Sequence, residues 1–252
     1  MAPVTNNADS LRIEVVESVD DIVSGFDSIC RAFGDQTQDA IWMVANPGWE
    51  TPEGRQLCAS RLAARLTTAT RDRQGRPNTI FLKATINEGE DETSRKIVGM
   101  AIWLQASVVE GCGDKPAEDP STAMNLEDLY PGDKATQQFF CDLSRSLHAR
   151  RVQVVKEKAL SSVPSAMVLD LCAVDPSFQG KGIAKQLVQW GLDEAKSRGN
   201  LECILEASTM GRRVYLKMGF EQEGPEIEYD VAEQFAGVKL PSNVFLRTQK
   251  GV

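Results

Sequence analysis

Hydrophobic and polar residues alternate at the start of the chain and then recur at helical spacing. Residues 11–17 have the two-residue period of a strand, and residues 20–33 place Ile22, Phe26 and Ile29 three or four positions apart. Ser18 stands where an N-cap would start that helix. The pattern predicts a strand followed by an amphipathic helix.

The helical pattern stops at residues 45–52. A new helix is predicted to open at Thr51 and Pro52, because proline is favoured at the first position of a helix. Two strands are predicted next, at residues 79–86 and 96–107. The residues between these strands, 87–95, are polar, and we expect them to form a hairpin tip.

Residues 108–160 separate the third predicted strand from the fourth. Residues 111–133 are rich in Gly, Pro, Asp and Ser, which predicts a long loop, and the apolar positions of 135–157 have helical spacing. We interpret the segment as an insertion, not as a domain boundary. Residues 1–252 are therefore expected to form a single domain.

The C-terminal part of the chain combines strands and helices. Strands are predicted at 166–174 and 202–207, with a helix over 183–198 between them. A strand, a crossover helix and a second strand predict two parallel neighbours in one sheet. A short helix at 209–218 and two closing strands, EIEYDVA (226–232) and NVFLRTQ (243–249), complete the prediction.

The composition is ordinary for a globular protein and narrows the classes of function. Hydrophobic residues make up 42%, and no apolar run approaches the roughly 20 residues of a membrane span. The net charge of −8 argues against binding to nucleic acid, which needs a basic stripe. No signal peptide is apparent, so the cytoplasm is expected, with the nucleus as the alternative. The six cysteines include no CxxC pair, so we expect buried free thiols and no metal.

The segment QGKGIA, Gln179–Ala184, carries the clearest chemical signal. It follows a predicted strand and opens a helix, so several backbone N–H groups converge where the helix dipole adds about half a positive charge. Such a site suits a pyrophosphate. The GxGxxG of dinucleotide folds is absent. The GK-[ST] of nucleoside triphosphatases is absent too, because Gly182 follows Lys181. A nucleotide-binding protein that uses this loop stays the alternative.

This segment resembles the Q/R-x-x-G-x-G/A signature of the GNAT superfamily of N-acetyltransferases. LCAVDP before it, and LEAS and VYLKMGF after it, extend the resemblance over about 166–221. The resemblance implies an α+β fold with a mixed, mostly antiparallel sheet of about seven strands flanked by helices. The sheet would be splayed between its fourth and fifth strands, with the insertion between the third and fourth.

The resemblance implies transfer of an acetyl group from acetyl-CoA to an amine by direct attack in a ternary complex. The acceptor would be a small molecule or a peptide, no nucleic acid or membrane partner is expected, and a homodimer stays open. Coenzyme A would be bound by residues of the fourth strand, the glycine loop and the segments beyond: Leu171, Cys172, Ala173, Val174, Gln179, Gly180, Lys181, Gly182, Ile183, Ala184, Lys185, Ser208, Gly211 and Tyr215.

Tyr215 matches the family's tyrosine in the stretch Y-x-K-x-G-F, where it often protonates the departing thiolate. With a reference pKa near 10 it is protonated at neutral pH and ready to donate. Cys172 is the alternative, as a covalent nucleophile, but no basic partner is near it in the sequence. Direct transfer with Tyr215 as the acid is therefore the leading hypothesis, and a packing role is the alternative for this tyrosine.

The acceptor requires a base. An alkyl amine with a pKa near 10 must lose a proton to attack, at a cost of roughly 4 kcal/mol at neutral pH. Asp170 is the first candidate, since strand alternation places it on one face with Val168 and Cys172. Glu206 on the neighbouring strand is the second candidate and Glu50 the third; a structural hydrogen-bonding role is the alternative for Asp170.

The helix-to-helix connection that contains Trp49 and Glu50 is expected to cover the acceptor side, with a core role as the alternative for Trp49. His148, the single histidine, falls in the inserted helix and is interpreted as a surface or packing residue. Two other functions stay open at this point: a non-catalytic acyl-CoA-binding module, and an acyltransferase that uses another acyl-CoA.

Overall fold

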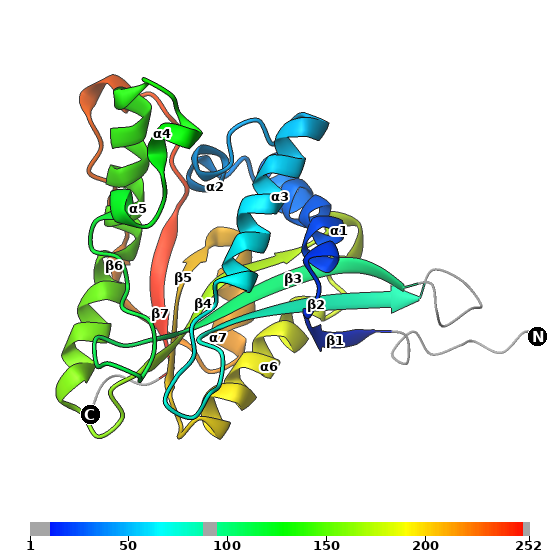
Figure 1. The fold of residues 1–252 in the computed structure, drawn as a ribbon, viewed down its shortest axis with the longest axis vertical. Coiled ribbons are helices and arrows are strands. Elements are labelled where there is room, and N and C mark those ends of the chain that lie inside the picture. The colour runs from blue at the N-terminus through cyan, green and yellow to red at the C-terminus, as the bar shows by residue number, and fades with distance from the viewer. Residues whose placement is uncertain (1–10, 88–94, 249–252) are drawn as a thin grey trace, which may run out of the picture.

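The computed structural model describes residues 11–87 and 95–248. Its centre is a seven-stranded sheet in the order β1-β2-β3-β4-β5-β7-β6, in which only β4 and β5 are parallel neighbours (Figure 1). The predicted mixed, mostly antiparallel sheet is thus confirmed. The strands are β1 (Arg12–Val15), β2 (Thr79–Asn87), β3 (Arg95–Ala106), β4 (Ala166–Val174), β5 (Glu202–Ser208), β6 (Glu221–Glu226) and β7 (Asn243–Arg247).

Helices cover both faces of the sheet. On one face lie α1 (Val19–Ile29), α2 (Ala40–Ala45), α3 (Pro52–Thr67) and the long inserted helix α5 (Lys134–Glu157). On the other face lies α6 (Ile183–Ser197), with α7 (Thr209–Lys217) after β5. No helix of the described residues is both long and apolar enough to cross a membrane.

Several helices begin where the sequence supplies a capping side chain. Ser18 and Thr51 accept hydrogen bonds from the amides of Asp20 and Gly54 at the starts of α1 and α3, as the sequence predicts. The insertion contains α4 (Leu126–Leu129) and α5, and Asp133 caps α5 through the amide of Thr136. The predicted inserted helix is therefore confirmed.

Two local predictions need correction. The helix after β1 does not stay α-helical to residue 33, because residues Cys30–Gln36 continue it as a wider π-helix. The strand predicted at 226–232 instead occupies Glu221–Glu226, where Gly224 and Pro225 lie within a register shift against β7. Proline is tolerated on this edge strand because its missing N–H costs no inner hydrogen bond. The predicted hairpin tip lies mostly in 88–94, outside the described residues.

The two parallel strands β4 and β5 separate halfway along their length. They pair from Ala166↔Glu202 to Leu169↔Leu205 and no further, while β4 continues to Val174 and β5 to Ser208. A bulge in β4 leaves Asp170 without a partner on β3. The predicted splay is therefore present, and the point after Leu169 and Leu205 is called the fork below.

The bulge corrects the predicted facing of the β4 side chains. Before it, Val168 faces α5, whereas after it Cys172 packs on the side of α6. Asp170 therefore shares a face with Val168 but not with Cys172. The sequence prediction was wrong here because strict two-residue alternation cannot anticipate one extra residue in a strand.

A buried arginine of the inserted helix spans the fork. Arg151 of α5 donates from Nη1 to Oδ1 of Asp170 at 2.8 Å and from Nε to Oε1 of Glu206 at 3.1 Å, with a second bond from Nη2 to Glu206. Arg65 of α3 donates to the other oxygen of Asp170 at 2.8 Å. One cation thus joins the first separated residues of β4 and β5 to the inserted helix.

On the opposite face, Gly191 of α6 lies directly against Trp103 of β3, which is fully buried. A Cβ added at Gly191 would come within 1.9 Å of Cε2 of Trp103. Although alanine has the higher helix propensity, we predict that Gly191→Ala lowers the free energy of unfolding by about 1–3 kcal/mol through overpacking. Urea unfolding, with the exposed α6 substitution Gln186→Ala as control, measures the loss; a more stable Gly191→Ala protein would contradict this packing.

A second prediction concerns Arg151. Arg151→Met leaves Glu206 buried and unpaired and takes one of two arginines from Asp170, so the free energy of unfolding at pH 7 should fall by about 3–5 kcal/mol. The matched control is the neighbour Arg150, whose partners Glu157 and Glu223 are more exposed. Arg150→Met should cost no more than about 1 kcal/mol.

The stabilisation by Arg151 should depend on pH. Arg65 and Arg151 hold the pKa of Asp170 below its usual range although burial opposes this, so the wild type loses the stabilising ion pairs only as pH falls through the acid range. In Arg151→Met, Asp170 keeps only Arg65 and takes up its proton at higher pH, so the difference from wild type should shrink from pH 7 to pH 5. A difference that is equal at both pH values would contradict an electrostatic role for Arg151.

Candidate functional site

The first cavity lies beyond the fork, at the carboxyl end of β4. Its volume is about 430 Å³, and β4, the glycine loop, the first turns of α6 and α7, and the π-helical segment Cys30–Gln36 surround it. We call it the loop cavity. The predicted coenzyme A residues that line it are Cys172, Ala173, Val174, Gln179, Gly180, Gly182, Ile183, Ala184, Lys185, Ser208, Gly211 and Tyr215.

Both glycines of the loop are required by backbone conformation. Gly180 has a φ of 75° and Gly182, the N-cap of α6, a φ of 80°, in the left-handed region that side chains disfavour. An added Cβ would meet no other atom within 4 Å at either position. The loop is therefore open on this side, where its N–H groups and the start of α6 favour an anion.

Two of the predicted coenzyme A residues do not line the loop cavity. Leu171 faces the second cavity described below, and Lys181 places its ammonium 4.9 Å from the centre of the Phe178 ring. The sequence analysis assigned every residue of 171–174 and 179–185 to coenzyme A binding. In the structure alternate side chains of a strand face opposite sides, and one side chain of the loop turns outward.

The π-helical segment forms a wall of the loop cavity that the sequence did not reveal. Gln36 and Gln179 exchange hydrogen bonds between their side-chain amides, at 3.0 and 2.8 Å, and Gln179 also donates to the carbonyl of Val174 at 3.0 Å. Phe33 and Thr37 line the cavity nearby. The glutamine of the glycine loop thus fixes this wall to the end of β4.

A second and larger cavity, of about 740 Å³, lies on the other side of the fork. We call it the insertion cavity, because residues 117–148 of the insertion form much of its wall, opposite α2 and α3. Phe140 and Leu147 give that wall apolar patches, and His148 lines it as well. The inserted segment therefore borders this cavity.

The two cavities meet at one place. Five residues line both of them, and we call this group the junction: Phe33, Asp39, Cys172, Ser208 and Tyr215. These residues come from the π-helical segment, the start of α2, β4, the end of β5 and α7. A group bound in the loop cavity and a molecule in the insertion cavity would contact each other here.

The titratable groups of the junction other than Asp39 are neutral at pH 7. Burial raises the pKa of the Cys172 thiol to about 12 and that of Tyr215 well above 10, and the Cys172 sulfur also raises the pKa of Tyr215. Tyr215 therefore keeps its proton and can donate it. Cys172 lacks the thiolate character that a covalent nucleophile needs.

Asp170 and Glu206 line the insertion cavity, but arginines already occupy their carboxylates. Although burial opposes it, Arg65 and Arg151 hold the pKa of Asp170 well below its usual range. A carboxylate held in this way is a weak proton acceptor. The role of either residue as the base stays a prediction that the structure does not favour.

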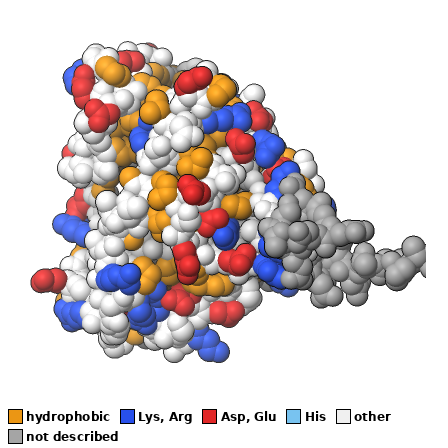
Figure 2. Space-filling model, turned by 45° about the vertical axis from the view of Figure 1, so that its right-hand side comes forward, with side chains coloured by type: hydrophobic (Ala, Val, Ile, Leu, Met, Phe, Trp, Pro, Cys, Tyr) orange, Lys and Arg blue, Asp and Glu red, His pale blue; other side chains and the backbone are white. Residues whose placement is uncertain are grey.

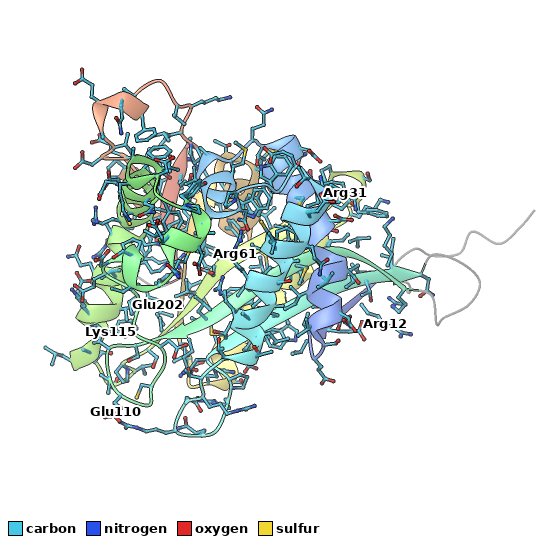
Figure 3. All side chains as sticks on the ribbon, turned by 45° about the horizontal axis from the view of Figure 1, so that its top comes forward. Arg12, Arg31, Arg61, Glu110, Lys115 and Glu202 are labelled. Atoms are coloured by element: carbon cyan, nitrogen blue, oxygen red, sulfur yellow. The ribbon has the colours of Figure 1, made fainter. Side chains whose placement is uncertain are left out.

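His148 and Arg61 also line the insertion cavity, and sequence reasoning did not select either for the site. Burial and Arg151 lower the pKa of His148 to about 4, so it is neutral at pH 7. Figure 3 shows Arg61 directed from α3 toward the space beside the inserted helices, and its guanidinium contacts the Cys58 sulfur at 3.0 Å. The packing of the insertion against α2 brings these residues together.

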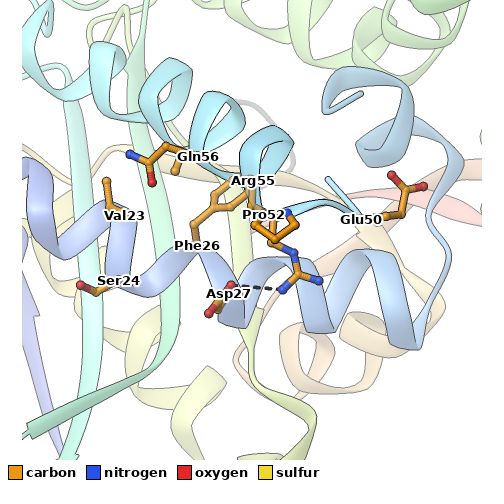
Figure 4. Close-up of a pocket in the computed structure, with 9 residues that line it drawn as sticks. Val23, Ser24, Phe26, Asp27, Glu50, Pro52, Arg55 and Gln56 are labelled. Atoms are coloured by element: carbon orange, nitrogen blue, oxygen red, sulfur yellow. Dashed lines mark hydrogen bonds and ion pairs between the residues drawn. The ribbon is translucent and has the colours of Figure 1, made fainter. Parts of the chain in front are cut away.

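Trp49 and Glu50 do not line either of these cavities. Trp49 is 8% exposed and packs edge-on against Trp42 with ring centres 5.5 Å apart, so it occupies the core. Glu50 lines a third, outer hollow between α1 and α3, where Arg55 and Asp27 form an ion pair at 3.3 Å (Figure 4). The structure therefore separates Glu50 from the junction.

On the face in Figure 2, basic and acidic side chains are interspersed. The six cysteines are free thiols, four of them buried. Within residues 11–87 and 95–248, no group of three or more His, Cys, Asp or Glu side chains is placed to hold a metal ion.

Comparison with known proteins covers both the sequence and the fold. Residues 154–233, which contain the fork and the glycine loop, match the family model of the acetyltransferase (GNAT) domain. No curated protein matches the sequence.

Several solved structures share the fold over nearly the whole chain. A structure of histone acetyltransferase HPA2 and related acetyltransferase from Corynebacterium glutamicum is 20% identical, with a TM-score of 0.55 over 96% of this chain and 98% of that one. Polyamine N-acetyltransferase from Drosophila melanogaster is 13% identical, with a TM-score of 0.59 over 94% and 98%. Arylalkylamine N-acetyltransferase 2 from Aedes aegypti is 18% identical, with a TM-score of 0.55 over 94% and 97%. The family-model match thus identifies a GNAT acetyltransferase domain at residues 154–233, and the chain as a whole shares the fold of these acetyltransferase structures.

Proposed function

We propose that residues 1–252 form one catalytic domain that transfers an acetyl group from acetyl-CoA to a small-molecule amine. The junction carries this proposal, because a cavity beside an anion-binding loop meets a second cavity at a protonated tyrosine. The loop cavity takes the donor and the insertion cavity the acceptor. The match of residues 154–233 to the acetyltransferase (GNAT) domain supports the type of reaction.

The loop cavity suits the pyrophosphate and thioester arm of the donor. The amides around Gly180 and Gly182 and the start of α6 supply the positive end of a helix dipole to the pyrophosphate. The separated ends of β4 and β5 leave room for the arm to reach the junction. The amide of Val174 is proposed to stabilise the oxyanion that develops at the thioester carbonyl.

The insertion cavity suits a small acceptor. Its volume of about 740 Å³ lies within the range of roughly 300–1,000 Å³ that small-molecule sites occupy. The Drosophila and Aedes structures with this fold are named for polyamine and arylalkylamine acetylation. These two names, together with the volume of the cavity, support a small amine as the acceptor of this chain.

The chemistry follows from the protonation states at the junction. Since the Cys172 thiol is neutral, the amine attacks the thioester directly in a ternary complex. Tyr215 donates its proton to the departing sulfur. Two alternatives, a non-catalytic acyl-CoA-binding module and the use of a longer acyl-CoA, are distinguished by measuring release of the coenzyme A thiol.

The overall reaction can be tested directly. With acetyl-CoA and a panel of polyamines, arylalkylamines and short peptides, release of the coenzyme A thiol should depend on a small amine. Acetyl-CoA binding without thiol release for any amine would favour a binding module, and faster turnover of a longer acyl-CoA would correct the donor. If ATP or NAD raised the melting temperature and coenzyme A did not, the donor site itself would be wrong.

A separate prediction concerns the hydroxyl of Tyr215. Tyr215→Phe keeps the ring but removes the proton, so kcat should fall roughly 10²-fold while the KM for acetyl-CoA changes little. Tyr130→Phe is the control, because that hydroxyl donates to the carbonyl of Val44 at 2.8 Å and does not line the junction. Steady-state kinetics measure both variants. Unchanged kcat in Tyr215→Phe would leave the tyrosine a packing role only.

A further inference from the structure

We propose that Asp39 is the catalytic base, which binds the ammonium of the acceptor at the junction and takes its proton. The inference rests on the proposed function and assigns a residue that the sequence did not single out. Asp39 is the one carboxylate, among the described residues, that lines both cavities. A base for acyl transfer needs this position, since the nitrogen loses its proton where it meets the thioester.

The local structure fixes Asp39 in place and leaves it free to act. It is the N-cap of α2, and its Oδ1 accepts a hydrogen bond from the amide of Trp42 at 2.9 Å. The residue is half-buried, and no Lys, Arg or His within the described part of the chain lies within 4.0 Å of its carboxylate. An incoming ammonium would therefore be its counter-ion.

The other carboxylates of the site differ from Asp39 in this respect. Asp170 is paired with Arg65 and Arg151, and Glu206 with Arg151 in two hydrogen bonds. The fork therefore has its own cations, and an acceptor amine would have to displace a buried arginine to reach either acid. Breaking a buried pair costs several kcal/mol, whereas Asp39 needs no such exchange.

The surroundings of Asp39 favour the uncharged form of its carboxyl. Burial raises its pKa above the usual value, while the amides of Trp42 and Ile41 oppose that rise. A raised pKa makes the carboxylate a stronger proton acceptor than an exposed aspartate. Phe33, whose ring is stacked on Trp42 with centres 6.0 Å apart, lines the junction together with Asp39.

Few other charges act on this group. Tyr229 faces Asp39 from the segment after β6, and burial together with Asp39 keeps its hydroxyl protonated. Cys172 and Tyr215 are neutral, and so is His148 across the insertion cavity. Glu206, the nearest acid on β5, is neutralised by Arg151.

The step is balanced in protons and bonds. The amine nitrogen attacks the thioester carbon, so a C–N bond forms and the C–S bond breaks. The ammonium nitrogen loses two protons in all, and the first goes to the carboxylate of Asp39 before the attack. The departing sulfur receives the proton of Tyr215, and the second proton of the nitrogen restores the tyrosine. Asp39 gives its proton to solvent after product release.

The experiment compares Asp39→Asn with wild type. Asparagine caps a helix as well as aspartate does, so α2 and acetyl-CoA binding should be preserved. At pH 7, kcat/KM for the amine should fall by roughly 10²–10⁴-fold. Because the variant can use only amine that is already neutral, its rate should rise about tenfold per pH unit and approach wild type near the amine pKa of about 10. Wild type should stay nearly flat over neutral pH and lose activity as acid protonates Asp39.

Asp35→Asn is the matched control, because it removes an exposed carboxylate of the same π-helical segment that lines neither cavity. It should keep the wild-type rate and pH profile. A wild-type pH profile in Asp39→Asn, or a loss of rate that is equal at every pH, would overturn the role of Asp39 while the proposed function stands. Wild-type protein that turns over no amine would overturn both.

Discussion

The buried guanidinium of Arg151 is the interaction on which the rest of the site depends. Two parallel strands that stop pairing leave polar backbone and, here, the carboxylates of Asp170 and Glu206 at the point of separation. A buried carboxylate without a partner would cost several kcal/mol. Arg151 contacts both acids with hydrogen bonds of suitable geometry, so the fork stays open without an uncompensated charge.

Because Arg151 belongs to the inserted helix, the same contact ties the insertion to the sheet. The inserted residues then complete the wall of a cavity that α2 and α3 alone would leave open. The arginine also separates two kinds of acid in the site. Asp170 and Glu206 hold the architecture, and Asp39, which has no cation of its own, is available to the substrate. Structural and chemical roles are thereby assigned to different carboxylates.

The sequence predicts those parts of the site that depend on short-range patterns. The strand, glycine loop and helix around Gly180 and Gly182 need only local conformation, and Tyr215 follows from a motif of six residues. The facing of Cys172 was mispredicted, because the bulge at Asp170 arises from pairing with β3. Asp39, His148 and Arg151 lie far from the loop in sequence and reach the site only through packing of the π-helical segment and the insertion. The position of Glu50 also depends on packing, because the turn that carries it packs toward α1 and α3 and not toward the junction.

The central claim is that donor and acceptor meet at the junction between the two cavities. A crystal structure with coenzyme A and the acetylated product tests it most directly. The account predicts the sulfur within hydrogen-bond reach of the Tyr215 hydroxyl and the product amide nitrogen beside the Asp39 carboxylate, with Arg151 still bound to Asp170 and Glu206. A product nitrogen bound at Asp170 or Glu206, or a coenzyme A thiol outside the loop cavity, would contradict the account.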